Sequence, residues 1–386
     1  MINASDRATL LHKRVSHGER LISDPVLPIA EAGVNHDGSL DDACRMIDVA
    51  AEAGADVVKF QTFDPEAVLT ARAMKAAYQA NNTGEGGTQL DMVRKLALSR
   101  DDHRVLAARC ERKGVRFMSL AFDMGSLEFL SGLDMPAIKI PSGDLTWAAM
   151  LLASARVGPP LIVSTGMATL NEVRDALAII AYGMTRDGDP PHAQALHQAF
   201  TQGHQALRER VTLLHCTTEY PAPLEAINLR AMTTMAETFG LKVGYSDHSL
   251  GQTVAIAAVA RGACVIEKHF TLSRTRPGPD HPASLEPDEL AAMVRSIREV
   301  EIALGRPEKQ PATAELGNLT IARRSLVATR AIQRGETLTL DMMTAKRPAD
   351  GLSPMQQWRL IGTAAQRDYE PDDALDAADA DGQGTL

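Results

Sequence analysis

The chain has 386 residues, of which 45% are hydrophobic and 23% charged, and its formal net charge is −9. This composition is typical of a globular protein, and the length predicts one large domain with a smaller one. The negative charge argues against a surface that attracts nucleic acid or anionic membrane, and no apolar run reaches the roughly 18 residues that a membrane span needs.

The first 24 residues are polar and lack the apolar core of a signal peptide, so we expect an N-terminal extension at 1–24 of a cytoplasmic protein. The four cysteines form no CxxC pair, and three of them lie in periodic apolar segments. They are expected to be small buried side chains in a reducing compartment.

A strand-then-helix rhythm fills residues 25–305. Short β-rich runs are expected as strands at 27–36, 56–63, 115–122, 137–144, 161–167, 211–221, 242–248 and 264–270. Amphipathic stretches are expected as helices at 41–55, 100–114, 124–133, 145–158, 169–183, 228–240, 251–263 and 286–305. Eight even units predict a closed (β/α)8 TIM barrel of about 280 residues. A doubly wound open sheet is the alternative, which the absence of GxGxxG after the first run disfavours.

Two longer connections interrupt the rhythm. Residues 64–96 follow the second predicted strand, at the end of a barrel where active sites form, which indicates a lid or substrate-binding loop. Residues 185–210 precede the sixth strand and belong to the opposite end. Their histidines, His192, His197 and His204, are better explained by a solvated helical insertion than by a metal site.

The rest of the sequence predicts a separate C-terminal part. Residues 306–319 are expected to be a linker. Residues 320–376 contain short strand-like runs broken by glycine turns and predict a small β-rich domain. The polar residues 377–386 are expected to form a disordered tail.

Polar residues stand at the C-terminal end of every predicted barrel strand. Because these ends converge on one face, we expect their side chains to line one pocket. Its ammonium and hydroxyl groups suit a ligand with phosphate and carboxylate groups, and they belong to Lys59, Lys139, Lys268, Ser142, Ser164, Thr165 and Ser246. A lysine that forms a Schiff base, as in many barrel aldolases, is the alternative and requires a neutral amine.

His248 and His269 end neighbouring predicted strands, beside Asp247 and Glu267. Either histidine alone would more often be structural, but the pair can bind a divalent metal and leave positions open for substrate and water. Two protein ligands hold an ion loosely, which favours Mn or Mg completed by substrate oxygens over a structural zinc.

Seven motifs together resemble the bacterial sialic acid (nonulosonic acid) synthases, over about residues 25 to 375. They are IAEAGVNHDGSLDDA, AGADVVKFQTF, AIKIPSGD, STGMAT, LLHCTTEYPAP, GYSDHSLG and IEKHFTLSRTRPGPDHPASLEPDEL. The later stretch SLVATRAIQRGETLTLDMMTAKRP resembles the antifreeze-like (SAF) domain of these enzymes. The resemblance implies a catalytic barrel followed by an SAF domain.

The resemblance also implies a transferase of the N-acetylneuraminate synthase type. Phosphoenolpyruvate (PEP) would condense with the open-chain aldehyde of an N-acylated mannosamine-type sugar, giving a nine-carbon 2-keto acid and phosphate by C–O cleavage. His248 and His269 match ligands of a divalent metal, Mn or Mg, that polarises the aldehyde. Glu31 matches the residue expected to handle the proton of the attacking water.

Further residues match substrate-binding positions of the family. Those expected at PEP are Lys59, Lys139, Ser142, Ser164 and Ser246, and those expected near the sugar are Gln61, Asp144, Tyr220 and Asp280. In this family the SAF domain reaches across a homodimer and covers the partner barrel. Arg347 matches the arginine that contacts the sugar's acyl group there.

The chain departs from the family pattern at several positions. Leu120 stands where a threonine is usual near PEP, and Asp144 where glutamate is common. Thr218, which is also expected to bind substrate, stands where some members have asparagine. The motifs TTEYPAP and KIPSG lean towards members that make legionaminic acid from a 2,4-diacetamido-2,4,6-trideoxy sugar. The acceptor therefore stays open between that sugar and N-acetylmannosamine.

A non-catalytic protein is the remaining alternative. It would use the C-terminal module to bind polysaccharide or ice. That hypothesis does not explain why the predicted barrel mouth is polar at every strand end.

Overall fold

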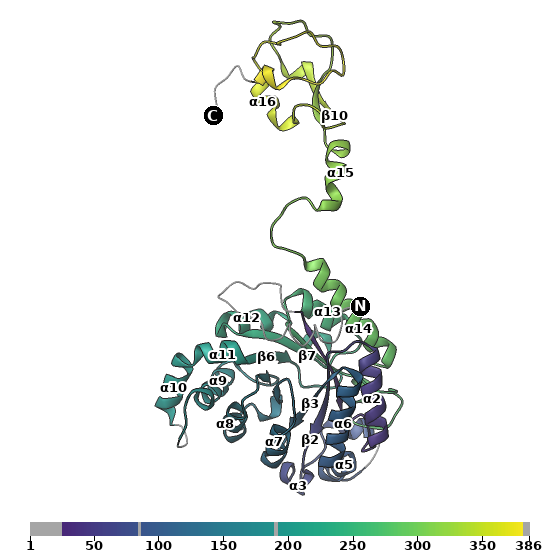
Figure 1. Cartoon of the computed structure of the whole chain (residues 1–386), viewed down its shortest axis with the longest axis vertical. Coiled ribbons are helices and arrows are strands. Elements are labelled where there is room, and N and C mark those ends of the chain that lie inside the picture. The colour runs from purple at the N-terminus through teal and green to yellow at the C-terminus, as the bar shows by residue number, and fades with distance from the viewer. Residues whose placement is uncertain (1–24, 84–85, 189–191, 381–386) are drawn as a thin grey trace. The chain divides into compact units, whose positions relative to one another are not determined.

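The computed structural model describes residues 25–83, 86–188 and 192–380, so the extension predicted at 1–24 lies outside the described residues. The chain divides into two compact units, Met1–Gly305 and Arg306–Leu386 (Figure 1). Within the described ranges, no helix has both the length and the apolar character to cross a bilayer.

The first unit is a closed barrel of eight parallel strands, paired in sequence order from β1 to β8 and back to β1. The strands are β1 (Leu27–Gly33), β2 (Val57–Thr62), β3 (Arg116–Ala121), β4 (Ile138–Ile140), β5 (Leu161–Ser164), β6 (Val211–Cys216), β7 (Lys242–Asp247) and β8 (Val265–His269). Nearly all their residues are buried, as expected for parallel strands covered on both faces. The predicted barrel is confirmed, and the open-sheet alternative is wrong.

A ring of helices surrounds the strands (Figure 1). They are α2 (Leu40–Glu52), α6 (Arg100–Lys113), α7 (Met124–Ser131), α8 (Ala148–Val157), α9 (Leu170–Thr185), α12 (Arg230–Phe239), α13 (Thr253–Ala260) and α14 (Pro287–Leu304). Local chemistry sets their ends. Capping boxes start α6 at Ser99 and α9 at Thr169, and left-handed glycines end α6 and α12 at Gly114 and Gly240.

The connection after β2 contains α3 (Pro65–Val68), α4 (Ala77–Thr83) and α5 (Gln89–Leu96). Residues of this connection form a small apolar cluster with Val34, which directly follows β1. Val34, Met92 and Leu96 are buried in the cluster, and Phe63 and Val93 pack against them. The connection follows the C-terminal end of a strand, so its helices stand at the same end of the barrel as the predicted site.

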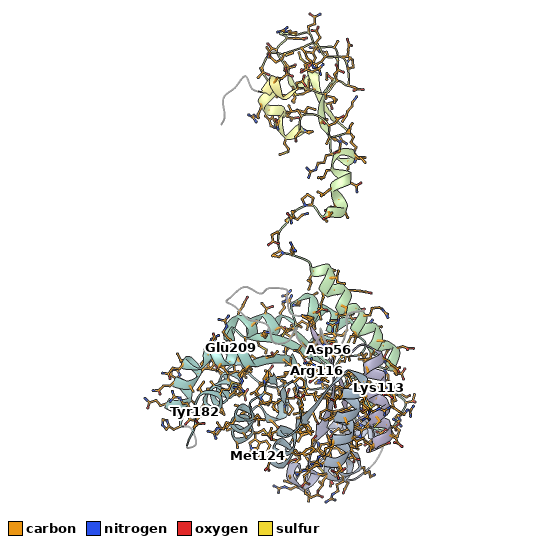
Figure 2. The ribbon with its side chains drawn as sticks, viewed as in Figure 1. Asp56, Lys113, Arg116, Met124, Tyr182 and Glu209 are labelled. Atoms are coloured by element: carbon orange, nitrogen blue, oxygen red, sulfur yellow. The ribbon has the colours of Figure 1, made fainter. Side chains whose placement is uncertain are left out.

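The insertion before β6 forms α10 (Ala193–Gln202) and α11 (His204–Arg210). Figure 2 marks Tyr182 on α9 and Glu209 on α11, and these helices pack side by side. His192 caps α10 by accepting the Ala195 N–H, and His204 Nε2 lies 2.8 Å from the Phe239 carbonyl oxygen. The prediction of a helical insertion is confirmed, and two of its histidines have structural partners.

The second unit consists of α15 (Thr313–Ala322), the antiparallel strands β9 (Ser325–Ala328) and β10 (Met343–Lys346), and α16 (Gln357–Leu360). Eleven buried residues, among them Leu326, Leu360 and Tyr369, form its core. The predicted linker at 306–319 overlaps α15, which begins at Thr313. Of the predicted tail, Ala377–Ala380 forms a 3-10 helix in which Asp379 accepts a hydrogen bond from the Tyr369 hydroxyl, and residues 381–386 lie outside the described residues.

Candidate active site

The C-terminal ends of four strands bring two acids and two lysines together inside the barrel. Lys59 Nζ lies 2.7 Å from Glu31 Oε2 and 3.2 Å from Glu267 Oε2. Lys139 Nζ lies 3.5 Å from Glu267 Oε1 and donates to Ser164 Oγ at 2.7 Å. All these charged side chains are buried. Burying a charge is tolerable only when it is paired, so this chain of contacts is what permits four ions in the core.

The two acids of this cluster have opposite pKa shifts. Burial raises the pKa of Glu31 to about 7, although the ammonium group of Lys59 opposes the change. Burial acts in the same direction on Glu267, but Lys139 and Lys59 outweigh it and hold the pKa at about 2. Near neutral pH, Glu267 is thus a fixed negative charge while Glu31 can take up or release a proton.

The two lysines also differ. Burial alone would lower the pKa of Lys59, but Glu267 and Glu31 outweigh it and raise the pKa above its usual value. Burial lowers the pKa of Lys139, and Glu267 offsets this only in part. Lys59 therefore stays protonated, whereas Lys139 binds its proton less tightly than an ordinary lysine.

A cradle of hydroxyl groups adjoins Lys139. Ser142 Oγ accepts the Gly166 N–H at 2.9 Å and lies 3.0 Å from Cys216 Sγ. A Cβ atom at Gly166 would lie 2.8 Å from Ser142 Oγ and would collide with Thr218 Oγ1. Glycine at this position therefore leaves the space into which the two hydroxyls project. Hydroxyls and a backbone N–H beside a lysine suit an anionic group.

His248 and His269 meet at the ends of β7 and β8, with ring centroids 5.8 Å apart. His248 Nδ1 lies 2.6 Å from the Thr217 carbonyl oxygen. Because a carbonyl only accepts, Nδ1 carries the proton and Nε2 keeps its lone pair, with the Ser246 hydroxyl 3.5 Å away. His269 Nδ1 is buried and has no hydrogen-bond partner in the described part of the chain.

The charge state of both rings suits metal binding. Burial lowers the pKa of His248 to about 4. Burial, together with His248 and Lys59, lowers the pKa of His269 well below its usual value. Both rings are neutral at pH 7, which metal ligands must be. In residues 25–83, 86–188 and 192–380 no set of three or more His, Cys, Asp or Glu side chains is arranged to hold an ion, so the pair would have to share an ion with non-protein oxygens.

A cavity of about 250 Å³ opens beside His269. Three residues predicted to lie near the sugar, Gln61, Tyr220 and Asp280, line it. Burial raises the pKa of Asp280 to about 6. The ring of Tyr220 lies 4.1 Å from that of His248 and stacks at 5.1 Å on Tyr78 of α4. The connection after β2 supplies most of the remaining lining, as its predicted role in a lid or substrate loop requires.

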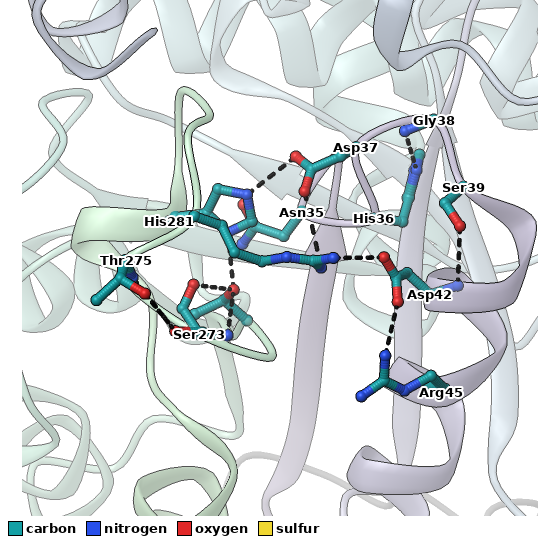
Figure 3. Close-up of polar contacts among 12 residues, drawn as sticks. Asn35, His36, Asp37, Gly38, Ser39, Asp42, Arg45, Ser273, Thr275 and His281 are labelled. Atoms are coloured by element: carbon teal, nitrogen blue, oxygen red, sulfur yellow. Dashed lines mark hydrogen bonds and ion pairs between the residues drawn. The ribbon is translucent and has the colours of Figure 1, made fainter.

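A polar network fixes the loop that carries Asp280. Arg276 pairs with Asp42 at 2.5 Å and with Asp37 at 3.7 Å, and His281 Nε2 lies 3.0 Å from Asp37 Oδ1. Figure 3 shows Asp37, in the loop after β1, facing His281 in the loop after β8, while Asp42 of α2 bonds Arg45 on its other side. Because His281 follows Asp280 directly, these contacts position the carboxyl group at the cavity.

Three predicted pocket residues behave differently from the rest. Lys268 is wrongly placed by the prediction, because it faces away from Glu267 and His269 and pairs with Asp247 at 2.8 Å. Asp144 is half-buried in a 3-10 helix next to Ser142, and burial raises its pKa to about 6. Arg347 lies in the second unit, where its Nε donates to the Ala322 carbonyl at 2.8 Å.

Two residues of the site were missed by the sequence reasoning. Glu267 was noticed as a strand-end acid but was given no role, although side chains two apart on a strand share a face and Glu267 therefore accompanies His269. Ser246, which was predicted, donates to Glu267 Oε1 at 2.9 Å and shares a strand face with His248 in the same way. Tyr78 was missed because it lies in a connection without a strand pattern that would aim its side chain.

Comparison with known proteins decides the family. The model of the NeuB family matches residues 46–309, and that of the SAF domain matches residues 323–380. The chain belongs to the NeuB family. This NeuB-family protein is 42% identical over 349 residues to the N,N'-diacetyllegionaminic acid synthase of Campylobacter jejuni, covering 90% of this chain and 98% of that one.

Two further relatives extend the comparison. The N,N'-diacetyllegionaminic acid synthase of Legionella pneumophila is 41% identical over 337 residues, or 87% of this NeuB-family chain and 89% of its own. The crystal structure of the N-acetylneuraminic acid (sialic acid) synthetase from Leptospira borgpetersenii superposes with a TM-score of 0.63 at 31% identity, covering 76% of this chain and 90% of that one. Both similarities agree with a synthase-type barrel.

Proposed function

We propose that this protein is a transferase that condenses PEP with the open-chain aldehyde of an N-acylated mannosamine-type sugar. The products are a nine-carbon 2-keto acid and phosphate. The observation that carries the proposal is the buried chain of Lys59, Glu267 and Lys139 beside the two neutral histidines. Of the two acceptors left open by the sequence, the 2,4-diacetamido-2,4,6-trideoxy sugar is favoured, since two relatives at 42% and 41% identity are N,N'-diacetyllegionaminic acid synthases.

PEP carries a carboxylate and a phosphate, and the interior of the barrel offers a place for both. Lys59 and Lys139 supply positive charge, and the Ser142 hydroxyl in the cradle at Gly166 supplies directional hydrogen bonds. Ser164 and Ser246 are already bonded to Lys139 and Glu267 and are positioned to share those bonds with the ligand. Fixed donors in a water-poor site are worth more than the same groups in water.

His248 and His269 would hold a divalent ion, Mn or Mg. Their neutral charge state, the unprotonated Nε2 of His248 and the Nδ1 of His269, which has no hydrogen-bond partner among the described residues, fit this role. When bound, such an ion supplies a Lewis acid that polarises the aldehyde oxygen. Tyr220, whose ring packs on His248, lies where it can orient the sugar beside the pair.

The reaction balances as PEP, aldehyde and water giving keto acid and phosphate. The PEP methylene carbon forms a bond to C1 of the sugar, where the C=O π bond breaks and the oxygen takes up a proton to become a hydroxyl group. Water adds at PEP C2 as positive charge develops there. Glu31 accepts the proton of that water, for which a pKa of about 7 is well suited. The C–O bond to phosphate then breaks, and Lys59, 2.7 Å from Glu31, stabilises the charges around it.

The same proposal includes the assembly. We expect a cytoplasmic homodimer in which the SAF domain of each chain covers the barrel mouth of the other, with Arg347 contacting the acyl group of the sugar. Support comes from the SAF match at residues 323–380 and from the exposure of Arg347 on its own unit. A lid of this kind would exclude water from the intermediate.

Phosphate release tests the function. Purified protein with Mn or Mg should release phosphate from PEP only when an acceptor sugar is present, and faster with the diacetamido-trideoxy sugar than with N-acetylmannosamine. PEP labelled with 18O at the bridging oxygen should yield labelled phosphate, because the C–O bond breaks. An imine trapped by borohydride with pyruvate would favour the Schiff-base aldolase instead, and no phosphate release with either sugar would refute the synthase.

A further inference from the structure

We propose that the apolar wall of the cavity beside His269 selects acceptor sugars that end in a methyl group at C6 over sugars with a C6 hydroxyl. This inference rests on the proposed function and assigns the choice of acceptor to named residues. The wall is formed by Val34, Phe63, Met92, Val93 and Leu96, and we call this set the distal wall.

The distal wall is a continuous apolar surface. Val34, Met92 and Leu96 are buried against one another, with Phe63 and Val93 packed on them. The capping box at Thr88 and Asp91 starts α5 and sets the register at which Met92, Val93 and Leu96 meet the cavity. Phe63 is held in turn by the edge of the Phe122 ring at 6.2 Å, and Phe122 also lines the cavity.

The same cavity also has polar lining residues. They are His269, Gln61, Tyr220 and Asp280. Gln61 Nε2 lies 3.5 Å from Glu31 Oε1, which places Gln61 next to the charged cluster. The reacting aldehyde must meet PEP near the histidines, so we place C1 of the sugar beside His269 and C6, at the other end of the open chain, against the distal wall.

Tyr78, Gln79 and Gln89 are the remaining polar side chains of the lining. Gln79 Oε1 accepts hydrogen bonds from the Ala76 N–H at 3.0 Å and from Gln89 Nε2 at 3.4 Å, so the two amides engage each other. None of the described residues that line the cavity is a lysine or arginine, so a C6 phosphate would meet no cation of the lining. The distal wall offers no hydrogen-bonding side chain, so a C6 hydroxyl placed against it would lose its water partners without replacement.

The size of the cavity fits this reading. Its volume of about 250 Å³ corresponds to roughly eight water molecules at about 30 Å³ each, enough for one hexose derivative. A hydrophobic pocket rejects an added hydroxyl by no more than about 100-fold. We therefore expect a preference between about 10-fold and 100-fold, and not absolute selectivity.

Two acceptors isolate the C6 position: 2,4-diacetamido-2,4,6-trideoxymannose and its counterpart with a C6 hydroxyl. For the wild type, kcat/KM from phosphate release should favour the deoxy sugar by about 10-fold or more. Met92→Gln places an amide at the distal wall and should bring the ratio close to one. Met92→Leu is the matched control, because it keeps the surface apolar and should keep the preference.

A second pair guards against misfolding of the Met92→Gln variant. Val93→Thr exchanges a methyl group for a hydroxyl at nearly constant shape and should lower the preference about threefold. The same exchange at Val105, exposed on α6, should leave both activities unchanged. A wild-type ratio near one, or a ratio unchanged in the folded wall variants, would overturn the inference while leaving the function intact. If no phosphate is released with either sugar, the proposed function is overturned, and this inference with it.

Discussion

The barrel mouth has two sides built by opposite means. On the side of the strand ends, Glu31, Lys59, Lys139 and Glu267 are buried charges, each within 3.5 Å of an opposite one. On the side of the connection after β2, the distal wall has no charged member. Hydrogen-bonded strands keep their charged side chains at defined distances more precisely than a connection outside the sheet can. Under the two proposals made above, the reaction chemistry belongs to the strands and the choice of acceptor to the connection.

The largest expected effect lies on the strand side. His248→Ala and His269→Ala should each lower turnover by more than about 1,000-fold, because loss of a Lewis acid costs several kcal/mol of transition-state stabilisation. Chelation of wild-type protein should do the same, and Mn or Mg should restore activity. His204→Ala, in the insertion, is the control and should retain activity. Near-normal turnover of either site variant in metal-free buffer would contradict the role of the pair.

The same substitution, lysine to methionine, at a buried and at an exposed position compares how much each charge contributes to stability. Lys59→Met leaves Glu31 and Glu267 buried without their shared cation and should lower the free energy of unfolding by about 3–5 kcal/mol. Lys113→Met removes a cation from the barrel exterior (Figure 2), where Asp48 keeps Arg109 as a partner, and should change stability by less than about 1 kcal/mol. Urea unfolding of both variants measures the difference, and equal losses would refute it.

The raised pKa of Glu31 predicts a pH dependence. The carboxylate is the active form of a base, so kcat/KM should fall about tenfold per pH unit below pH 7 and level off above it. Glu31→Gln should lower the plateau by about 100-fold and remove this slope. A slope at the same pH in the variant would assign the titration to another group.

The smallest effect concerns the second unit. Arg347→Ala should raise the KM of the acceptor by about fivefold to tenfold, the net worth of one ordinary hydrogen bond, and should change the KM of PEP much less. The neighbouring Lys346, paired with Asp372 on the same unit, offers a control in Lys346→Ala. Equal changes in both KM values would remove the case for a role of Arg347 in sugar binding.

The sequence predicted the barrel well because its signal is local. Eight apolar runs, each with a polar end, can be read without knowing the tertiary contacts, and the two histidines on neighbouring strands followed from the same pattern. Lys268 was misplaced because only strand alternation separates it from Glu267 and His269. Had the two-residue period been applied to β8, it would have removed Lys268 from the pocket and added Glu267.

The distal wall could not be predicted from the sequence, for a different reason. Met92, Val93 and Leu96 lie in a helix whose sequence shows an amphipathic pattern but not which cavity its apolar face meets. Val34 comes from the loop after β1, far from them in the chain. Such contacts arise from the packing of separate connections, and a single sequence contains no local signal for them. The 3-10 helix at 377–380 likewise depends on such contacts, because Asp379 accepts hydrogen bonds from the Tyr369 hydroxyl and the Gln366 N–H.

The ion pair behind the site has a consequence for the metal that we propose at the two histidines. Lys268 precedes His269, and it bonds the residues on either side of His248, contacting Asp247 at 2.8 Å and the Ser249 carbonyl at 2.6 Å. Through these contacts Lys268 ties the backbone that carries one imidazole to the backbone that carries the other. We expect the two rings to keep their spacing without an ion, so that divalent cations of different sizes could bind there with little rearrangement of the backbone.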